Sequence, residues 1–355
     1  MSESTEQYSL PLPPFRPSPE SARRIMRTQL TVLVLPALAA VILFGPGALK
    51  LILVAALTAM LIELLCTAGV SPAPAEDADG MSAVRKKIPG NITHSVMMGV
   101  LLAFTLPAEC PWYIAMIGSA VAVLIGKRLF GGLGRYRWHP ALVGRLAVQL
   151  LFNEQIAASI TPLRALCHWG DLRFVDSVPQ LSLYLYGKLP SLQQCQWSAA
   201  GGGLGESCRV LLILVGLYFI YRGYLHWQLP LMFIVSAYAA AAFFPIIVEQ
   251  PGLPSRLIYN PLLAESLSVG FTYINYHLFT GGLILTACIM TADMTSRPLT
   301  VRGQTYFAVG AGLLTIAVRL YCPAVLSEYL TPISAYTALL VMNTLVPMKS
   351  TALPL

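Results

Sequence analysis

Charged residues are scarce in this 355-residue sequence: they make up 11% of the chain, whereas hydrophobic residues make up 56%. A soluble globular protein typically carries about 25% charged residues. The composition therefore excludes a soluble domain and predicts a polytopic membrane protein. Lys and Arg number 23 against 16 Asp and Glu, but in a membrane protein cations are first of all topology signals. We expect the lipid bilayer as the surrounding partner and no nucleic acid.

Metal and thiol motifs are also missing. The seven cysteines include no C-x-x-C pair and no cysteine–histidine pattern of metal-ligand spacing. The five histidines include no pair at i, i+4, the spacing that places two ligands on one helix face. No carboxylate is expected beside them either. These absences predict no metal site, no bound haem and no thiol redox centre.

Ten apolar runs dominate what the sequence does contain, many of them near the roughly 20 residues that a bilayer requires. The first follows Arg23, Arg24 and Arg27 without a small-residue cleavage site, so it predicts a transmembrane helix rather than a signal peptide. The runs are residues 30–44, 49–70, 92–106, 112–125, 141–152, 210–221, 229–248, 278–290, 305–320 and 325–346. The expected fold class is an all-α polytopic membrane protein with about ten transmembrane helices.

The distribution of cations indicates the orientation. Most of the 23 Lys and Arg fall in segments that are cytoplasmic when the N-terminus is inside, as the positive-inside rule requires. Residues 92–130 and 277–321 also resemble each other in hydropathy and include the third and eighth runs, which are five apart. An odd offset inverts the second copy, so we expect two inverted five-helix halves with sites at their interface.

This layout predicts five segments. Residues 1–22 are polar and cannot bury enough apolar area to fold, so they are expected to form a disordered cytoplasmic tail. The remaining segments are a first five-helix half (23–152), a periplasmic loop (153–208), a second five-helix half (209–348) and a C-terminal tail (349–355). Both termini are expected in the cytoplasm.

Three charged residues are candidates for an ion pathway or for intramembrane pairing. Glu63 lies within the second run, and Arg145 lies near the start of the fifth. Each charge costs at least ~2.5 kcal/mol at the centre of a membrane helix, so each needs a partner. We expect Glu63 to pair with Arg145 or with Lys127 as a structural clasp, or alternatively to serve cation passage. Asp293 closes the eighth run, where we expect a cationic partner or a loop hydrogen bond.

Residues 126–145 interrupt the apolar pattern with glycines, cations and aromatics. Glycine permits backbone turns with positive φ, so this stretch predicts an irregular cytoplasmic turn rather than a helix. Two interpretations stay open for it. One is contact with a cofactor or a neighbouring subunit, and the other is a plain turn whose cations meet lipid phosphates.

Several motifs together resemble one known family. They are S-V-M-M-G-V-L-L-A-F-T-L-P-A-E-C-P-W (95–112), G-K-R-L-F-G-G-L-G (126–134), W-x-P-A-L-V-G-R (138–145), T-P-L (161–163), G-L-G-E-S (203–207), T-G-G-L-I-L-T-A-C-I-M-T-A-D-M-T-S (280–296) and V-M-N-T-L-V-P (341–347). Their order is similar to that of the RnfD and NqrB family, the membrane subunits of ion-pumping Rnf and Na⁺-translocating NADH:quinone oxidoreductase complexes. The compact loops resemble RnfD more closely.

The resemblance implies a flavoprotein. Members of the family carry FMN joined through its phosphate to a threonine, in a motif close to S/T-G-A-T-P-L, and a flavin transferase makes the bond. The matching segment here is A-S-I-T-P-L, so the acceptor maps onto Thr161. Pro162 disfavours helix at Thr161 and keeps it accessible. Gly205, Glu206 and Ser207 are candidates to cradle the flavin phosphate at a helix start, although a plain helix entry is the alternative.

The sequence departs from the family pattern at four of these positions. Ala158 and Ile160 replace the first and third residues of the flavin motif, and Tyr136 and His139 stand where relatives carry asparagine. The last two fall in the glycine-rich stretch, which is the candidate place for a second, noncovalent flavin.

The family implies a role in the bacterial inner membrane as one subunit of a redox-driven, ion-translocating complex. Such a subunit takes electrons from a neighbour, passes them to a second flavin subunit and helps to couple the transfer to Na⁺ or H⁺ movement. The sequence contains no NADH or ferredoxin site, so we assign no catalytic residue to this chain alone. Two inverted halves also suit a channel or transporter for a small solute, which is the alternative function.

Overall fold

A computed structural model describes residues 22–68, 78–159, 203–206, 209–248, 256–260, 267–279 and 281–346. The first part of the chain forms α1 (Ala22–Phe44), α2 (Pro46–Ala68), α3 (Ala78–Phe104), α4 (Trp112–Val121), the π-helix η1 (Ala122–Arg128), α5 (Pro140–Leu151) and α6 (Asn153–Ala158). The 3₁₀ turn η2 (Leu204–Glu206) leads to the second part, which begins with α10 (Arg209–Tyr221).

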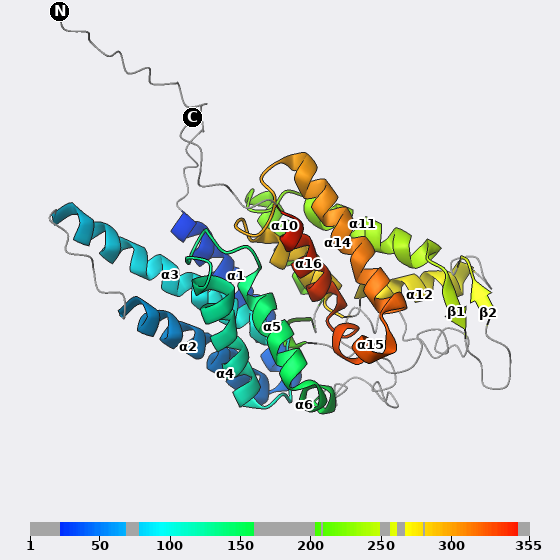
Figure 1. The fold of residues 1–355 in the computed structure, drawn as a ribbon, viewed down its shortest axis with the longest axis horizontal. Coiled ribbons are helices and arrows are strands. Elements are labelled where there is room, and N and C mark those ends of the chain that lie inside the picture. The colour runs from blue at the N-terminus through cyan, green and yellow to red at the C-terminus, as the bar shows by residue number, and fades with distance from the viewer. Residues whose placement is uncertain are drawn as a thin grey trace, which may run out of the picture.

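The second part continues with α11 (Gln228–Phe243), the strands β1 (Ile246–Val248) and β2 (Arg256–Ile258), and α12 (Leu267–Phe279). It ends with α13 (Leu283–Cys288), the 3₁₀ turn η3 (Met290–Ala292), α14 (Val301–Tyr321), α15 (Ala324–Leu330) and α16 (Ser334–Leu345). Figure 1 shows α2 to α6 grouped on one side of the molecule and α11, α12, α14 and α15 on the other. Between the two groups, α1 packs on α10, and α5 packs on α16.

The face of α2 that packs inward carries small residues. Ala55 and Ala59 lie against Gly99 of α3, where an added Cβ would come within 2.6 Å of the carbonyl oxygen of Ala55. The opposite face is a stripe of exposed leucines at a spacing of four residues: Leu49, Leu53, Leu57, Leu61 and Leu65. Small residues allow two membrane helices to approach closely, and an exposed apolar stripe suits hydrocarbon. The described part of the chain is therefore mostly helical with apolar outer faces, as expected for a membrane protein.

By length and composition, α1 and α2 are the described helices that qualify as membrane crossings, and the bent pair α12 and α13 would make a third. Other apolar helices are shorter, including the 12-residue α5 and the 13-residue α10. An α-helix rises 1.5 Å per residue, so these helices are shorter than the roughly 30 Å hydrocarbon core. The count of ten crossings stays a prediction.

Three apolar runs differ from the continuous helices that the sequence predicted. The run 278–290 is broken where Gly281 and Gly282 adopt φ of 60° and 71°, and the helices on either side are bent by 56°. The run 325–346 is split into α15 and α16 because Pro332 has no amide proton to continue the helix. The run 229–248 stops at Phe243, just before Pro245, and its end forms β1.

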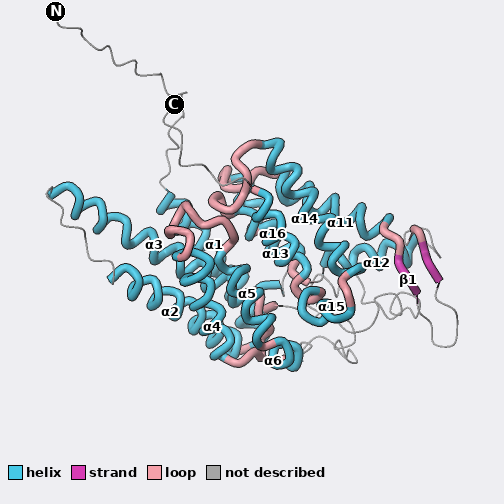
Figure 2. Tube along the Cα trace, viewed as in Figure 1, coloured by secondary structure: helices cyan, strands magenta, loops and turns pink. Residues whose placement is uncertain are grey.

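Strands β1 and β2 form a two-stranded antiparallel sheet, in which Ile247 lies opposite Leu257. Figure 2 shows this small sheet at one end of the molecule, away from α1 to α6. The all-α prediction is therefore correct for the bulk of the described fold and wrong for this short hairpin.

The middle of the glycine-rich stretch is an irregular turn, as predicted, whereas residues 126–128 lie in η1 and residues 140–145 lie in α5. Helix α4 passes into η1, and then residues 129–139 form a loop in which Gly131, Gly132 and Gly134 have φ of 97°, 90° and 85°. Residues with a Cβ rarely adopt such values, so glycine is needed at these positions. In η1 the backbone shifts to i→i−5 bonding, as in the 3.0 Å bond from the amide of Leu129 to the carbonyl of Leu124.

Candidate functional site

Two loops meet between the two groups of helices. Residues 129–139 come from the first group, and residues 293–300 come from the second. We call their meeting place the seam, defined by His94, Tyr136, His139, Asp293, Ser296 and Asn343. These residues come from α3, the two loops and α16, so positions that are distant in sequence meet only in the folded chain.

Tyr136 is the centre of the seam. Its hydroxyl lies 2.9 Å from His94 Nε2 and donates to Asp293 Oδ1 at 2.9 Å. The side chain is only 2% exposed. Burial raises the pKa of Tyr136 well above its usual value of 10, and the neighbouring Asp293 raises it further. The phenol therefore keeps its proton and stays a hydrogen-bond donor at neutral pH.

Asp293 accepts hydrogen bonds and forms no salt bridge within the described residues. Besides Tyr136, its donors are the hydroxyl of Ser296 at 2.9 Å and the backbone amide of Thr295 at 3.2 Å. The prediction of a loop hydrogen bond is confirmed. The expectation that no carboxylate lies beside the histidines is wrong, because Tyr136 links Asp293 to His94, and His139 lies within electrostatic range.

Asn343 holds the two loops together from α16. With its amide oriented to satisfy both contacts, it donates to the carbonyl of Ser296 at 3.0 Å and accepts from the backbone amide of His139 at 3.2 Å. Arg137 adds a hydrogen bond to the carbonyl of Thr344. The His139 ring is buried, and neither of its nitrogens has a hydrogen-bond partner in the described structure.

Glu63 forms a second buried cluster that lies within the first group of helices. Its carboxylate is 3.1 Å from Lys127 Nζ and 2.6 Å from Arg128 Nη2, and it accepts a 2.9 Å hydrogen bond from Ser95. Lys127 also donates to the carbonyl of Asn91 at 2.9 Å and to Ser95 at 2.8 Å. The predicted Glu63–Lys127 clasp is therefore confirmed.

The alternative pairing of Glu63 with Arg145 is wrong. Arg145 instead donates to the carbonyl of Thr105 at 3.1 Å and to Gln149 Oε1 at 2.6 Å. It lies in α5, which packs on α16, whereas Lys127 reaches Glu63 from η1, which packs on α2. Sequence distance alone could not separate these two partners.

The segment from Gly203 to Glu206 is packed rather than open. An added Cβ at Gly205 would lie 2.4 Å from Phe104 Cβ, and one at Gly203 would lie 2.3 Å from the carbonyl oxygen of Phe104. The buried Glu206 carboxylate accepts a hydrogen bond from Tyr336. These glycines allow close packing on α3, and the adjacent carboxylate would repel a phosphate. A flavin phosphate therefore does not fit here, and Ser207 and Thr161 lie outside the described residues.

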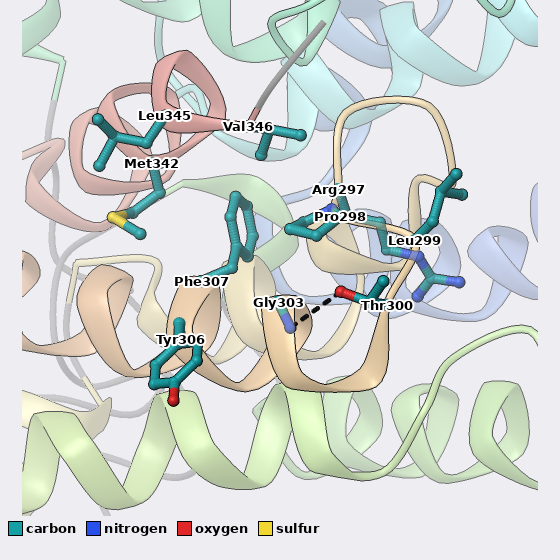
Figure 3. A pocket seen from close by; sticks show the side chains of 10 residues that line it. All are labelled: Arg297, Pro298, Leu299, Thr300, Gly303, Tyr306, Phe307, Met342, Leu345 and Val346. Carbon is teal, nitrogen blue, oxygen red and sulfur yellow. Dashed lines mark hydrogen bonds between the residues drawn. The ribbon is translucent and has the colours of Figure 1, made fainter. Parts of the chain in front are cut away.

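A cavity of about 580 Å³ lies beside the loop 293–300. Figure 3 shows it between this loop, the first turns of α14 and the end of α16. Its lining is almost entirely carbon, with Phe307 and Met342 among the side chains. The guanidinium of Arg297 bonds the carbonyls of Tyr224 and Thr291, and the Thr300 hydroxyl caps α14 at Gly303. Because the polar groups at its edge are already hydrogen-bonded and its lining is apolar, the cavity suits an apolar ligand group.

The chain matches a family model described as the NQR2, RnfD, RnfE family over residues 10–352. It is 29% identical over 305 residues to the D subunit of the Na(+)-translocating ferredoxin:NAD(+) oxidoreductase complex of Acetobacterium woodii, covering 85% of this chain and 81% of the relative. It is 29% identical over 317 residues to the D subunit of the proton-translocating ferredoxin:NAD(+) oxidoreductase complex of Clostridium ljungdahlii, covering 85% and 83%.

A third relative is the D subunit of the ion-translocating oxidoreductase complex of Halorhodospira halophila, which is 26% identical over 363 residues and covers 94% of this chain and 91% of its own length. Agreement over nearly the whole chain, together with the motifs at 95–112, 126–145 and 280–296, leaves one assignment. The chain belongs to the NQR2, RnfD, RnfE family.

Proposed function

We propose that this protein is the D-type membrane subunit of a redox-driven, ion-translocating oxidoreductase complex in the bacterial inner membrane. The observation that supports this most strongly is the family match over residues 10–352, together with relatives that are named as D subunits of such complexes. Its partners are the other subunits of the complex, including a second flavin subunit. Both termini lie in the cytoplasm.

The packing of the helices supports two repeated halves, and the odd offset of five runs would make the second half inverted. In the first part of the chain, α2 packs on α4, α4 packs on α5, and α1 packs on α3. In the second part, α11 packs on α14, α14 packs on α16, and α10 packs on α13. The two sets of contacts correspond when each helix of the first part is matched to the helix that is five apolar runs later. The matched helices are α1 with α10, α2 with α11, α3 with α13, α4 with α14 and α5 with α16. Sites at the interface of two such halves are typical of membrane transport proteins, and the seam occupies that interface.

Thr161 is the proposed attachment point of FMN, through a phosphoester made by a flavin transferase. Helix α6 ends at Ala158, so the A-S-I-T-P-L segment starts at the end of a short helix. Pro162 favours an extended conformation at Thr161, which suits an enzyme that must reach the hydroxyl. When bound, FMN would supply the acceptance and release of single electrons between neighbouring subunits.

The test is to express the chain with a flavin transferase and to examine the purified protein by in-gel flavin fluorescence and peptide mass spectrometry. We expect one FMN on the peptide that contains Thr161. Thr161→Ser keeps a hydroxyl and should retain flavin, whereas Thr161→Val should lose it. A matched control is Ser159→Ala, which removes a neighbouring hydroxyl that bonds the carbonyls of Gln155 and Ile156. Solute uptake by a flavin-free chain in vesicles would instead support a transporter.

A further inference from the structure

The seam contains a continuous line of hydrogen bonds between groups that exchange protons. Because a phenol carries one proton and Tyr136 donates it to Asp293, the hydroxyl oxygen must accept from His94. The proton of His94 therefore sits on Nε2. The other nitrogen, Nδ1, is buried and has no hydrogen-bond partner in the described structure. The line thus runs from an imidazole nitrogen without a hydrogen-bond partner, through a phenol, to a carboxylate.

The two ends of this line differ in access to water. His94 is 1% exposed and lies inside α3, whereas Asp293 lies in a loop and is partly exposed. Asp293 is therefore the end of the line that lies nearer to solvent. The titratable and charged groups that face the line come from α3, the loop 129–139, η1 and the loop 293–300. They are His94, Tyr136, His139, Lys127, Asp293 and Arg297.

The two cations in this set are engaged elsewhere. Lys127 is paired with Glu63 at 3.1 Å, and Arg297 bonds the carbonyls of Tyr224 and Thr291. Neither forms a salt bridge with Asp293 among the described residues. The carboxylate is thus free to change its protonation state without breaking an ion pair.

We propose that His94, Tyr136 and Asp293 carry protons, and that the ion handled at the seam is a proton rather than a metal cation. This inference rests on the proposed place of the chain in an ion-translocating complex. In one transfer, a proton binds His94 Nδ1 while the N–H bond at Nε2 breaks. The proton released from Nε2 forms a new O–H bond on Tyr136. The original hydroxyl proton of Tyr136 moves to Asp293 Oδ1. The imidazole and the phenol end neutral, and Asp293 ends protonated.

The arrangement of donors disfavours a metal cation at the same place. An ionised carboxylate has about four lone-pair sites, and three donors already occupy Asp293: Tyr136, Thr295 and Ser296. A hard cation typically takes about six oxygen ligands. The oxygens of Asp293 are surrounded by the hydrogens of its three donors, which leaves little room for a metal coordination shell. This arrangement suits proton transfer.

The direct test is infrared spectroscopy of the purified full-length chain, which follows the band of the protonated carboxyl group during a pH titration. Asp293→Asn assigns the band. Tyr136→Phe removes a donor that favours the ionised form, so the titration midpoint should move upward by about one pH unit. Tyr306→Phe changes an exposed tyrosine and should leave the midpoint unchanged. A midpoint that Na⁺ shifts, or that Tyr136→Phe leaves in place, would overturn the proposal.

A second measurement uses the assembled complex in proteoliposomes, with a pH-sensitive dye and labelled Na⁺ followed during electron transfer. His94→Gln can still donate a hydrogen bond to Tyr136 but cannot pass a proton. We expect proton movement per electron to fall at least tenfold in His94→Gln and Tyr136→Phe, with electron transfer retained. Proton movement equal to that of Tyr306→Phe would refute the relay. If the wild-type complex moves no ion, the proposed function fails, while the infrared titration still judges the proton site.

Discussion

Two carboxylates of this protein lie in opposite settings. Glu63 is fully buried between two cations, and a hydroxyl adds a further bond to one of its oxygens. Asp293 is partly exposed and is held by a phenol, a hydroxyl and a backbone amide, with no salt bridge in the described part of the chain. A buried ion pair cannot lose one charge without a large penalty. Glu63 therefore fixes structure within one helix group, whereas Asp293 can change its protonation state between the two groups.

The largest effect should follow from breaking the Glu63 cluster. Glu63→Gln leaves Lys127 buried without its counter-charge, which should destabilise the fold by about 3 kcal/mol or more. Thermal unfolding in detergent measures the loss. Glu109→Gln, which changes an exposed loop carboxylate, is the matched control and should be nearly neutral. Equal melting temperatures for the two variants would mean that the clasp is not a structural element.

A smaller loss of stability is expected when the seam is loosened. Asn343→Ala removes the two hydrogen bonds that join Ser296 to His139. Each such bond contributes about 1 kcal/mol, so the variant should lose about 2 kcal/mol in thermal unfolding. Thr344→Ala removes a neighbouring side chain whose hydroxyl donates to the carbonyl of Val341 within the same helix, and it should cost less. Similar losses would show that Asn343 does not hold the loops together.

Asp293→Asn should separate stability from transport. The amide keeps the shape of the carboxyl group and leaves no unpaired cation behind, so we expect a loss of about 1 kcal/mol or less. Ion movement by the complex should nevertheless fall at least tenfold. A thermal unfolding curve and a proteoliposome assay on the same preparation provide both values. If Asp293→Asn unfolds as readily as Glu63→Gln, the contrast between the two carboxylates is wrong.

The smallest effect concerns Tyr136 and is absent at neutral pH. Its pKa is raised in the folded protein by burial and by Asp293, so folded and unfolded chains both keep the proton below about pH 10. Above that pH the unfolded chain ionises first, and stability should fall by about 1.4 kcal/mol per pH unit. Ultraviolet absorbance of phenolate during alkaline titration should show a late-titrating fraction, and Tyr136→Phe should reduce that fraction by one tyrosine. A normal titration of Tyr136 would contradict its burial.

The sequence predicted the first carboxylate better than the second, for a physical reason. Glu63 is conspicuous because it is the one acidic residue in an apolar run. Its charge requires a cationic partner inside the membrane, so pairing with a nearby cation was predictable. The glycine turn at 131–134 was predictable on similar local grounds. The seam depends on contacts between residues 157 positions apart in sequence, as for Tyr136 and Asp293. Tyr136, His139 and Asp293 each stood out singly, but no local pattern shows that they meet.

Helix boundaries were predictable only where the chain marks them. The break at Gly281 and Gly282 lies inside an apolar run, and hydropathy does not report a change of direction. The pocket lined by Phe307 and Met342 likewise depends on how α14 and α16 pack, so composition could not indicate it. Family motifs identified the chain, but the hydrogen bonds of the Tyr136 hydroxyl and of the His139 backbone amide form only in the folded chain.

The π-helix η1 makes the Glu63 cluster sensitive to chain length. Its i→i−5 turn accommodates one more residue than an α-helical turn, and Lys127 and Arg128 lie at its end. Each residue of an α-helix advances the side-chain direction by about 100°. If residues 122–128 wound as an ordinary α-helix without losing a residue, Lys127 and Arg128 would be rotated by about 100° and would no longer face Glu63. Here the number of residues, as much as their identity, determines which charges meet.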